Sequence, residues 1–315
     1  DLPAGVRRVP LRRPGPARLR DRQHDWRLPH DLRRARPAGT VLTPGRTPPA
    51  RSPVPFVQTL HDLTPLVVDA PQLANERRHW QRVSARLRDA HRIIAVSRAT
   101  ADTAIRLLGV DGERVVVIPH GVDPSLHADE RDRATDVPVL LWVSSWGPHK
   151  GLPDAIATID ALADAGHPHV LHLAGWNDAW MRQQVDAAVA RARHPDRVRV
   201  LGYVDDIGAT YRRATALLVT SRCEGFCLPA AEAMACGTPV IAYDNTALPE
   251  LVGDAGVLVA DGELRAFIAA TQALLDDPHA AADRALRGIA RARTLTWEAS
   301  VAAHAEVLRD AARAG

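Results

Sequence analysis

The sequence lacks the features that would assign it to a membrane-spanning, secreted or zinc-binding class. No apolar run approaches the roughly 18 to 20 residues of a membrane span, and no charged start precedes an apolar stretch as in a secretory signal. The three cysteines Cys223, Cys227 and Cys236 form no C-x-x-C pair, so we expect small buried side chains rather than a metal site. These absences favour a cytoplasmic protein.

Lysine is almost absent as well. Of the 40 basic residues only Lys150 is a lysine, so the other 39 (40 less one) are arginines. The two side chains differ: a fork of five donors suits a wide planar target, whereas a compact ammonium fits as a point charge between crowded phosphate oxygens. The exception at position 150 therefore predicts a functional cation, and the alternative is a solvated surface lysine.

Positive charge is concentrated at the start of the chain. Residues 1–51 hold 13 Arg and 4 Asp, a balance of +9, so a net charge of +3 leaves −6 for the rest. Residues 1–25 are crowded with Pro and Arg and show no apolar periodicity, which predicts a poorly structured or aberrant leader. The alternative is a basic end that touches anionic lipid or a phosphate-rich partner.

From residue 54 onward, short apolar β-branched runs alternate with segments of helical period. The N-terminal half contains about three convincing strands, at 54–60, 91–97 and 114–121. Between them we expect a long helix with an apolar stripe from Leu73 to Ala90, and a helix capped by Ser97 that stops at Gly109. Strand, helix and strand in this order imply parallel pairing.

A second alternation follows residues 124–138, which are polar and predict a linker. It contains six expected strands, at 139–145, 169–175, 197–204, 216–221, 239–244 and 256–260, with intervening helices. This pattern predicts an α/β fold with a doubly wound parallel sheet. Three closing helices are expected near 262–275, 279–293 and 297–312.

In open parallel sheets ligands bind beyond the carboxyl ends of the strands. One such loop, "SSWGPHKG", carries Lys150 between two glycines and suits a phosphate, although it is not a Walker loop. In a second loop, Glu224 ends a strand and Glu232 lies one turn inside the next helix, so two carboxylates flank a helix N-terminus. The helix end suits a pyrophosphate and the carboxylates suit hydroxyls. A solvated Glu232 is the alternative.

The third loop follows the strand "FVQTL" and carries His61 just past the end of that strand. The alternative for His61 is a structural histidine that forms a hydrogen bond within a turn.

The stretch "EGFCLPAAE" is an E-x7-E motif, and with "HKG", "FVQTLHDLTP", "RIIAVSRATADTAIRLLGV" and "VVVIPHGVDP" it resembles the retaining nucleotide-sugar glycosyltransferases of family 4. The resemblance covers about residues 26–312. It implies the GT-B fold, in which two Rossmann-like doubly wound domains face a cleft.

The resemblance also implies roles for individual residues. Glu224 would orient the donor sugar, Glu232 would hold the ribose, Lys150 would bind the diphosphate, and His61 would face the reacting sugar. The donor would further contact the following residues: Gly225, Phe226, Cys227 and Leu228 through their backbone, and Gly202 and Tyr203 near the base.

Three positions depart from the family pattern. Ser145 stands where many relatives have an arginine, so Lys150 would carry more of the phosphate charge. Cys227 replaces the second glycine of E-G-F-G and is expected to narrow a spot where the backbone approaches the ligand. The family's first strand and its Gly-rich loop are not recognisable upstream of Trp26, so we expect an N-terminal domain that is truncated.

The resemblance divides the chain into five parts: a leader (1–25), an incomplete acceptor-side domain (26–123), a linker (124–138), a donor-binding domain (139–296) and a closing helix (297–315). It implies transfer of a hexose, with GDP-mannose slightly favoured over UDP sugars, to a hydroxyl acceptor without a metal or cofactor. Such acceptors are often lipid-linked or polysaccharide precursors, which implies peripheral contact with the inner face of a membrane and no nucleic-acid partner. The alternatives are a nucleotide-sugar epimerase or hydrolase, or an inactive donor-binding remnant.

Overall fold

The first of two parallel sheets is formed by the N-terminal part of the chain. The computed structural model describes residues 39–45, 47–129, 137–145, 147–175 and 179–314. The sheet has the strand order β1-β2-β3-β4. Its strands are β1 (Val41–Thr43), β2 (Phe56–Leu60), β3 (Arg92–Ala95) and β4 (Val115–Val117). All five residues of β2 are buried, as expected for a central strand covered on both faces.

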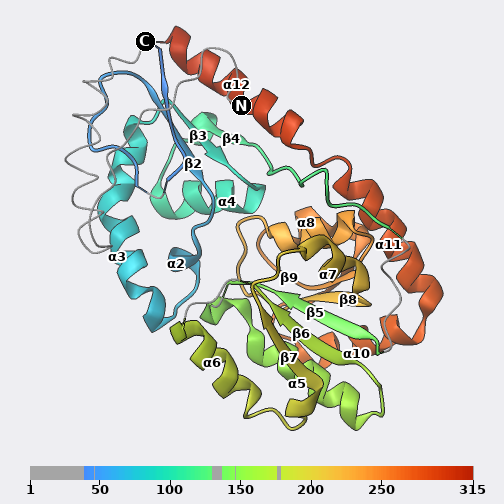
Figure 1. The fold of residues 1–315 in the computed structure, drawn as a ribbon. Helices are drawn as coiled ribbons and strands as arrows, with labels where there is room; N and C mark the ends of the chain where they lie inside the picture. Colours follow the sequence, from blue (N-terminus) through green and yellow to red (C-terminus); the bar gives the residue numbers. More distant parts are fainter. Residues whose placement is uncertain (1–38, 46, 130–136, 146, 176–178, 315) are drawn as a thin grey trace.

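Helices cover both faces of this sheet (Figure 1). One face packs against Trp80, Val83 and Leu87, and these belong to α3 and to the 3-10 turn that follows it. The other face packs against Val307 and Ala311 of the last helix. The helical elements of this part are α2 (Thr64–Val67), α3 (Ala74–Val83), the 3-10 turn η2 (Ser84–Asp89), α4 (Arg98–Thr103) and its π-helical continuation η3 (Ala104–Leu108).

The second sheet has six parallel strands in the order β10-β9-β8-β5-β6-β7. Its first strand, β5, therefore lies inside the sheet: the chain builds β6 and β7 on one side of it and then returns to build β8 on the other. The strands are β5 (Val139–Val143), β6 (Val170–Ala174), β7 (Val198–Gly202), β8 (Ala216–Val219), β9 (Val240–Asp244) and β10 (Val257–Ala260). The boundary between β5 and β8 is the topological switch point, where doubly wound sheets bind ligands.

Two apolar clusters sandwich the second sheet. One includes Ile156 of α5 and Phe267 of α10, and the other includes Ala230 of α8, Leu251 of α9 and Ala292 of α11. The helices of this part are α5 (Leu152–Asp164), α6 (Ala179–Val189), α7 (Ile207–Arg213), α8 (Leu228–Ala235), α9 (Leu248–Val252), α10 (Leu264–Asp276), α11 (Pro278–Ala292) and α12 (Trp297–Arg313).

The chain crosses between the two sheets twice, and the two crossings touch. The N–H of Val122 donates to the carbonyl of Leu295 at 2.9 Å, and Val122 forms an isolated β-bridge with Thr296. At Gly121 a Cβ atom would lie 2.2 Å from the backbone nitrogen of Trp297, so this contact requires glycine. Helix α12 then runs back along the first sheet (Figure 1).

The alternation predicted from the sequence is confirmed: two parallel-sheet α/β regions, the second with six strands. Three local predictions were wrong. The first sheet has a fourth strand, β1, and the helix predicted to reach Ala90 ends at Val83 and continues as a 3-10 turn. Strand β8 ends at Val219, so Glu224 lies in the following loop rather than at the strand end. The domain boundaries and the leader remain predictions, since 1–38 and 130–136 lie outside the described residues.

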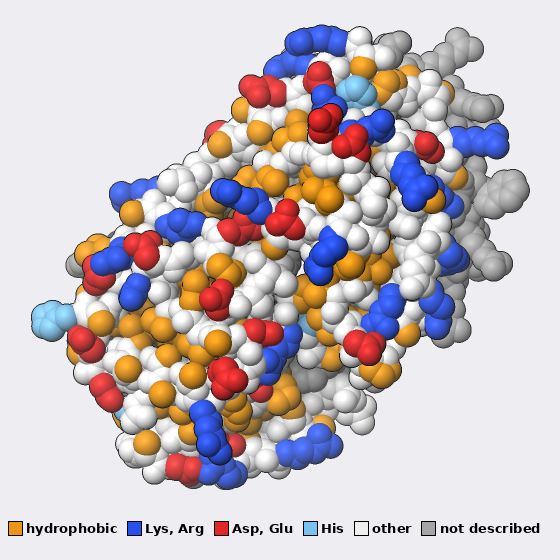
Figure 2. Space-filling model, turned by 180° about the vertical axis from the view of Figure 1, so that it is seen from behind, with side chains coloured by type: hydrophobic (Ala, Val, Ile, Leu, Met, Phe, Trp, Pro, Cys, Tyr) orange, Lys and Arg blue, Asp and Glu red, His pale blue; other side chains and the backbone are white. Residues whose placement is uncertain are grey.

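No described helix is both long enough and apolar enough to cross a membrane. Figure 2 shows acidic and basic side chains interspersed over the face of the molecule that it presents, with apolar side chains between them. On this face, the arginines do not gather into a single basic surface.

Candidate active site between the two sheets

The loops after β5 and β8 interlock at the switch point. The Thr220 hydroxyl donates to the carbonyl of Lys150 at 3.1 Å and to that of Gly151 at 2.8 Å, and the N–H of Arg222 donates to the carbonyl of His149 at 2.7 Å. Gly151 has a φ of 68°, and a Cβ there would lie 2.0 Å from the carbonyl oxygen of Thr220. The backbone around the single lysine is therefore fixed against the neighbouring loop, a contact that the two flanking glycines did not predict.

Lys150 and Glu224 form an ion pair in this loop contact. Lys150 Nζ lies 2.8 Å from Glu224 Oε1, and their side chains are only 18% and 10% exposed. Burial acts to lower the pKa of Lys150, but the adjacent Glu224 carboxylate outweighs burial and the pKa is raised. The ammonium is therefore charged at neutral pH. With three donors on Nζ it can keep Glu224 as one partner and offer the others to an anion.

Glu224 is held by the loop after β9. Its backbone N–H donates to the Thr246 hydroxyl at 2.9 Å, and Thr246 has a positive φ of 44°. The Asn245 amide in turn donates to the carbonyl of Ser221 at 2.9 Å. Three strand-end loops, after β5, β8 and β9, thus position one carboxylate and one ammonium.

The first sheet meets this loop cluster directly at Gly225. A Cβ on Gly225 would lie 1.9 Å from the backbone carbonyl oxygen of His61, which follows β2. The Thr100 hydroxyl donates to the carbonyl of Gly225 at 3.3 Å, and the Thr64 hydroxyl donates to Cys223 Sγ at 3.5 Å. The glycine of the E-x7-E motif therefore permits close approach of the two halves of the molecule.

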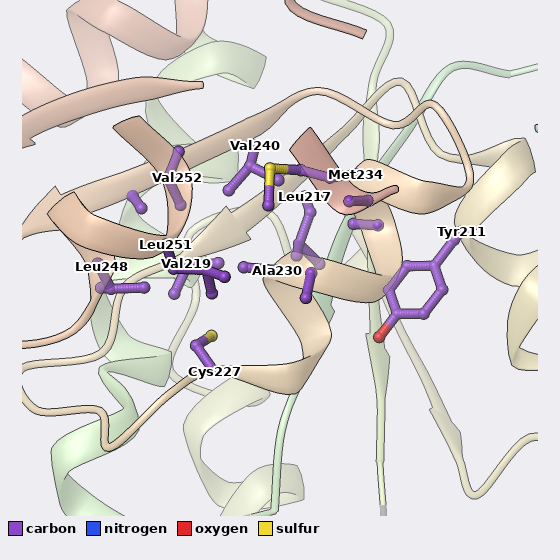
Figure 3. Close-up of a cluster of buried hydrophobic side chains, with 14 of the residues drawn as sticks. Tyr211, Leu217, Val219, Cys227, Ala230, Met234, Val240, Leu248, Leu251 and Val252 are labelled. Carbon is purple, nitrogen blue, oxygen red and sulfur yellow. The ribbon is translucent and has the colours of Figure 1, made fainter. Parts of the chain in front are cut away.

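Glu232 lies on α8, one turn beyond its start, and accepts a 2.8 Å hydrogen bond from the Tyr211 hydroxyl. Burial raises the pKa of Glu232 above its ordinary value, the Tyr211 hydrogen bond opposes this shift, and the nearby charge of Asp123 adds to it. Figure 3 shows the Tyr211 ring at the edge of the apolar cluster under α8. A carboxylate held in this way is a ready acceptor for a hydroxyl.

Cys227 precedes α8 with a φ of 76°, a left-handed conformation that favours glycine. Its side chain is buried in the cluster of Figure 3, and burial raises the pKa of the thiol. The departure from E-G-F-G therefore strains the backbone while the sulfur packs inward. That Cys227 narrows the spot where the backbone approaches a ligand stays a prediction.

The remaining predicted residues lie farther along the same sheet edge or beside it. Leu228 begins α8, and Phe226 is buried just before it. Ser145 is exposed in the loop after β5, Gly202 ends β7 with a φ of 70°, and Tyr203 is 72% exposed. Within the described residues, no hydrogen bond joins these last three to Lys150 or Glu224. Their predicted roles toward the donor remain predictions.

The sequence reading missed two residues at the junction of the halves. His120, on the crossing after β4, stacks on His61 with ring centroids 5.4 Å apart. Glu250 of α9 accepts from the backbone N–H groups of Arg98 and Ala99 at 3.1 and 3.2 Å, across the boundary to α4. Glu250 carries no local signal for a partner 152 residues away. His120 stands beside Gly121 in "VVVIPHGVDP", which was singled out only for its resemblance.

All three cysteines are free and buried. In the part of the chain that the structure describes, no group of three or more His, Cys, Asp or Glu side chains could hold a metal ion. The arrangement instead places one buried cation, a helix N-terminus and two carboxylates at a sheet edge. These groups can bind a diphosphate and orient hydroxyl groups beside it.

Two family models match the chain, one on each half. A model described as glycosyltransferase family 4 matches residues 2–126, and one described as glycosyl transferases group 1 matches residues 137–277. The first match extends into segment 1–25. Each half of the molecule that meets at Gly225 is thus matched separately.

Among known proteins, the O-antigen chain mannosyltransferase B of Escherichia coli is 28% identical over 258 residues, which cover 77% of this chain and 67% of that protein. A D-inositol 3-phosphate glycosyltransferase of Kineococcus radiotolerans is 30% identical over 306 residues, 82% of this chain and 66% of that protein. The chain therefore spans about two thirds of the length of these relatives.

Solved structures show the same fold. Sucrose-phosphate synthase from Thermosynechococcus elongatus has a TM-score of 0.74 and 26% identity, with 82% of this chain and 68% of that chain covered. Anabaena Alr3699/HepE in complex with UDP has a TM-score of 0.70 and 23% identity, with 81% and 72% covered. The E-x7-E motif, the two facing parallel-sheet regions and the matches on both halves lead to one conclusion: the chain belongs to the family 4 glycosyltransferases and has the GT-B fold.

Proposed function

We propose that this protein transfers a hexose from a nucleoside diphosphate sugar to a hydroxyl acceptor, with retention at the anomeric carbon. The observation that carries the proposal is the Lys150–Glu224 ion pair, 2.8 Å long and buried at the switch point beside His61. A buried ammonium next to a carboxylate supplies a counter-charge for a diphosphate and an acceptor for sugar hydroxyls. Glu232 would hold the ribose, and the backbone from Gly225 to Leu228 would face the phosphates.

Catalysis in this proposal is mainly electrostatic. As the bond between the anomeric carbon and the phosphate oxygen lengthens, negative charge grows on the leaving diphosphate, and Lys150 with the N-terminus of α8 stabilises it. The acceptor oxygen bonds to the anomeric carbon on the same face, and its proton passes to the leaving phosphate oxygen. No protein general base and no metal ion takes part. One such preorganised contact contributes about 3 kcal/mol, roughly two orders of magnitude in rate.

The donor and acceptor follow from the relatives by analogy. The mannosyltransferase relative favours a mannosyl donor, and the neighbour solved with UDP supports a nucleoside diphosphate as its carrier. The name of the same relative, an O-antigen chain mannosyltransferase, supports a growing polysaccharide chain as the acceptor. We further propose that this acceptor is linked to a lipid and reached at the inner face of a membrane. We place the protein in the cytoplasm under this proposal.

The test begins with the donor. Melting temperatures of the protein are measured with GDP, UDP, ADP and dTDP sugars, because a ligand that binds only the folded state raises the melting temperature. The sugar that gives the largest rise is then assayed for transfer. Product analysis without an acceptor separates transfer from hydrolysis and epimerisation, which would release free sugar or an altered nucleotide sugar.

The roles are tested by Lys150→Ala and Glu224→Ala, with Arg106→Ala and Glu306→Ala as exposed controls of the same charge. We expect each site variant to lose transfer by at least about a hundredfold while its circular-dichroism spectrum stays that of the folded wild type, and the controls to keep transfer. The melting temperature of each site variant should fall, because the remaining partner of the ion pair is left largely buried and unpaired. Near wild-type turnover in either site variant would show that the assigned role is wrong.

A further inference from the structure

His120 lies where three segments of the chain meet. Its ring stacks on that of His61 at an interplanar angle of 13°, meets Phe226 edge-on at 5.3 Å, and lies 5.7 Å from Trp297 of α12. Gly121, the next residue, has no room for a side chain against the backbone of Trp297. The position of His120 is therefore set by the crossing of the chain between the two sheets.

The hydrogen bonds of His61 define its tautomer. His61 Nε2 lies 3.0 Å from the carbonyl oxygen of Pro44, and a carbonyl only accepts, so Nε2 carries the proton. In the neutral ring Nδ1 is then an acceptor, and it lies 3.4 Å from His120 Nε2. His120 must therefore donate its Nε2–H to His61 Nδ1. His120 thus donates to His61, and His61 donates to the carbonyl of Pro44.

His120 is suited to act as a neutral donor. Burial and the adjacent rings of His61 and His304 lower its pKa to about 4. His61, in the loop after β2, and His304, on α12, are thus the titratable groups that act on His120. Phe226 contacts His120 from the loop after β8, and Glu224 lies two residues before Phe226 in the sequence. At neutral pH His120 is uncharged, so it can direct the proton of His61 as a neutral donor.

We propose that His120 is a positioning residue that holds His61 as an Nε2–H donor for a hydroxyl of the reacting sugar. This rests on the proposed function, in which His61 faces that sugar. His61 is exposed, and a sugar hydroxyl takes the place of the Pro44 carbonyl as acceptor when the donor binds. No covalent bond forms or breaks in this step. Only the acceptor of one hydrogen bond changes.

The direct test observes the two ring nitrogens of His61 by long-range proton–nitrogen NMR of the whole protein, with the His61 signals identified by their absence in His61→Gln. In the wild type we expect a protonated Nε2 and an unprotonated Nδ1. His120→Phe keeps an aromatic ring against Phe226 and Trp297 but removes the donor. It should lower the fraction of His61 rings that are protonated at Nε2, because among the described residues the Pro44 carbonyl is then the one remaining partner that favours this tautomer. We expect kcat/KM to fall about five- to tenfold, with an unchanged melting temperature.

His120→Gln is the matched variant, because its Nε2 is as many bonds from Cα as the histidine Nε2 and keeps a donor there. It should restore the His61 tautomer and bring kcat/KM back to within about threefold of the wild type. If the fraction of His61 protonated at Nε2 is the same in His120→Phe as in the wild type, or if the wild type protonates Nδ1 instead, the proposal is overturned. The same holds if His120→Gln behaves like His120→Phe.

The tautomer is read without substrate, so it separates this proposal from the proposed function. A wild-type protein that shows the expected tautomer, and loses it in His120→Phe, yet transfers no sugar would overturn the proposed function while the His120–His61 relation holds. If the wild type transfers sugar but the tautomer of His61 is the same whatever residue stands at position 120, the proposal for His120 would be overturned while the proposed function holds.

Discussion

The two sheets contribute different kinds of groups to their common boundary. The second sheet supplies the charges: Lys150, Glu224 and the Glu250 carboxylate. The first sheet supplies mainly uncharged groups, namely the carbonyl of His61, the hydroxyls of Thr64 and Thr100, and backbone N–H groups of α4. Under the proposed function, the second sheet would therefore supply most of the charge that a diphosphate needs, and the first sheet would mainly contribute geometry. Substitutions on the two sides should therefore lower the activity for different reasons.

The largest effect is expected where geometry alone is at stake, at Gly225. In Gly225→Ala the new Cβ would collide with the His61 carbonyl, only 1.9 Å away, and the halves could not meet. Transfer should fall by about a hundredfold or more, since a misplacement of about 1 Å costs that much. Gly112→Ala, whose Cβ would meet Ile105 at an ordinary 3.4 Å, is the control. Steady-state kinetics that leave both variants equal would contradict the close approach.

The next effect concerns the kind of charge rather than its presence. Lys150→Arg keeps the charge but places a wide guanidinium where the lysine side chain is only 18% exposed, and it can hold Glu224 through two hydrogen bonds. We expect kcat to fall about thirtyfold, less than the roughly hundredfold loss of a whole preorganised contact, because the positive charge is retained. Arg106→Lys, the reverse exchange at an exposed position, should change nothing. Equal activity of Lys150→Arg and the wild type would mean that any cation suffices there.

A smaller effect is expected at Glu250, whose carboxylate on the second half accepts from the backbone N–H groups of α4 on the first half. Glu250→Gln loses the negative charge that caps the N-terminus of α4 and one of its two acceptor oxygens. We expect kcat/KM to drop about fivefold, as for one helix-terminus charge. Glu113→Gln, an exposed glutamate within the first half, serves as control. The idea fails if both variants show the same kinetics.

The smallest expected effect is a gain rather than a loss, and it concerns the stability of the fold at Glu232. Burial raises the pKa of Glu232, so its folded-state pKa lies above the unfolded one, and the wild type loses stability as the pH rises through the folded pKa. Glu232→Gln removes this loss and can still accept from Tyr211. Its melting temperature should exceed that of the wild type by about 2 °C at pH 8, with the difference vanishing near pH 4. A difference independent of pH, or one shared by exposed Glu306→Gln, would argue against a titrating Glu232 as its cause.

Much of the second sheet could be predicted from its sequence because each strand there is a compact apolar run between turn residues. The first helix turn after "EGFC" was placed correctly because Pro229 is compatible only with the start of a helix. In the first sheet, β1 was missed since it has three residues and ends immediately before Pro44. A strand that short carries no periodicity of its own, and only pairing with β2 defines it.

The site was predicted as a set of residue types but not as a set of contacts. Lys150 and Glu224 were each assigned to the donor, whereas their ion pair joins loops 74 residues apart. Loop contacts of this kind depend on strand order, which the pattern of strands and helices does not specify. His120 illustrates the same limit of local signals: its relation to His61 arises where two crossings of the chain meet, 59 residues after His61.

Helix α12 has a consequence for the order in which the chain can fold during synthesis. Among the described residues, the last strand of the first sheet ends at Val117, and the apolar cluster on one face of that sheet is completed by Val307 and Ala311 of α12. A ribosome adds about 5 to 20 residues per second, so the roughly 180 intervening residues take on the order of ten to forty seconds. During that interval Val57 and Ile94 lack the contacts that Val307 and Ala311 make with them in the folded protein. The first sheet is therefore synthesised well before the helix that completes its packing.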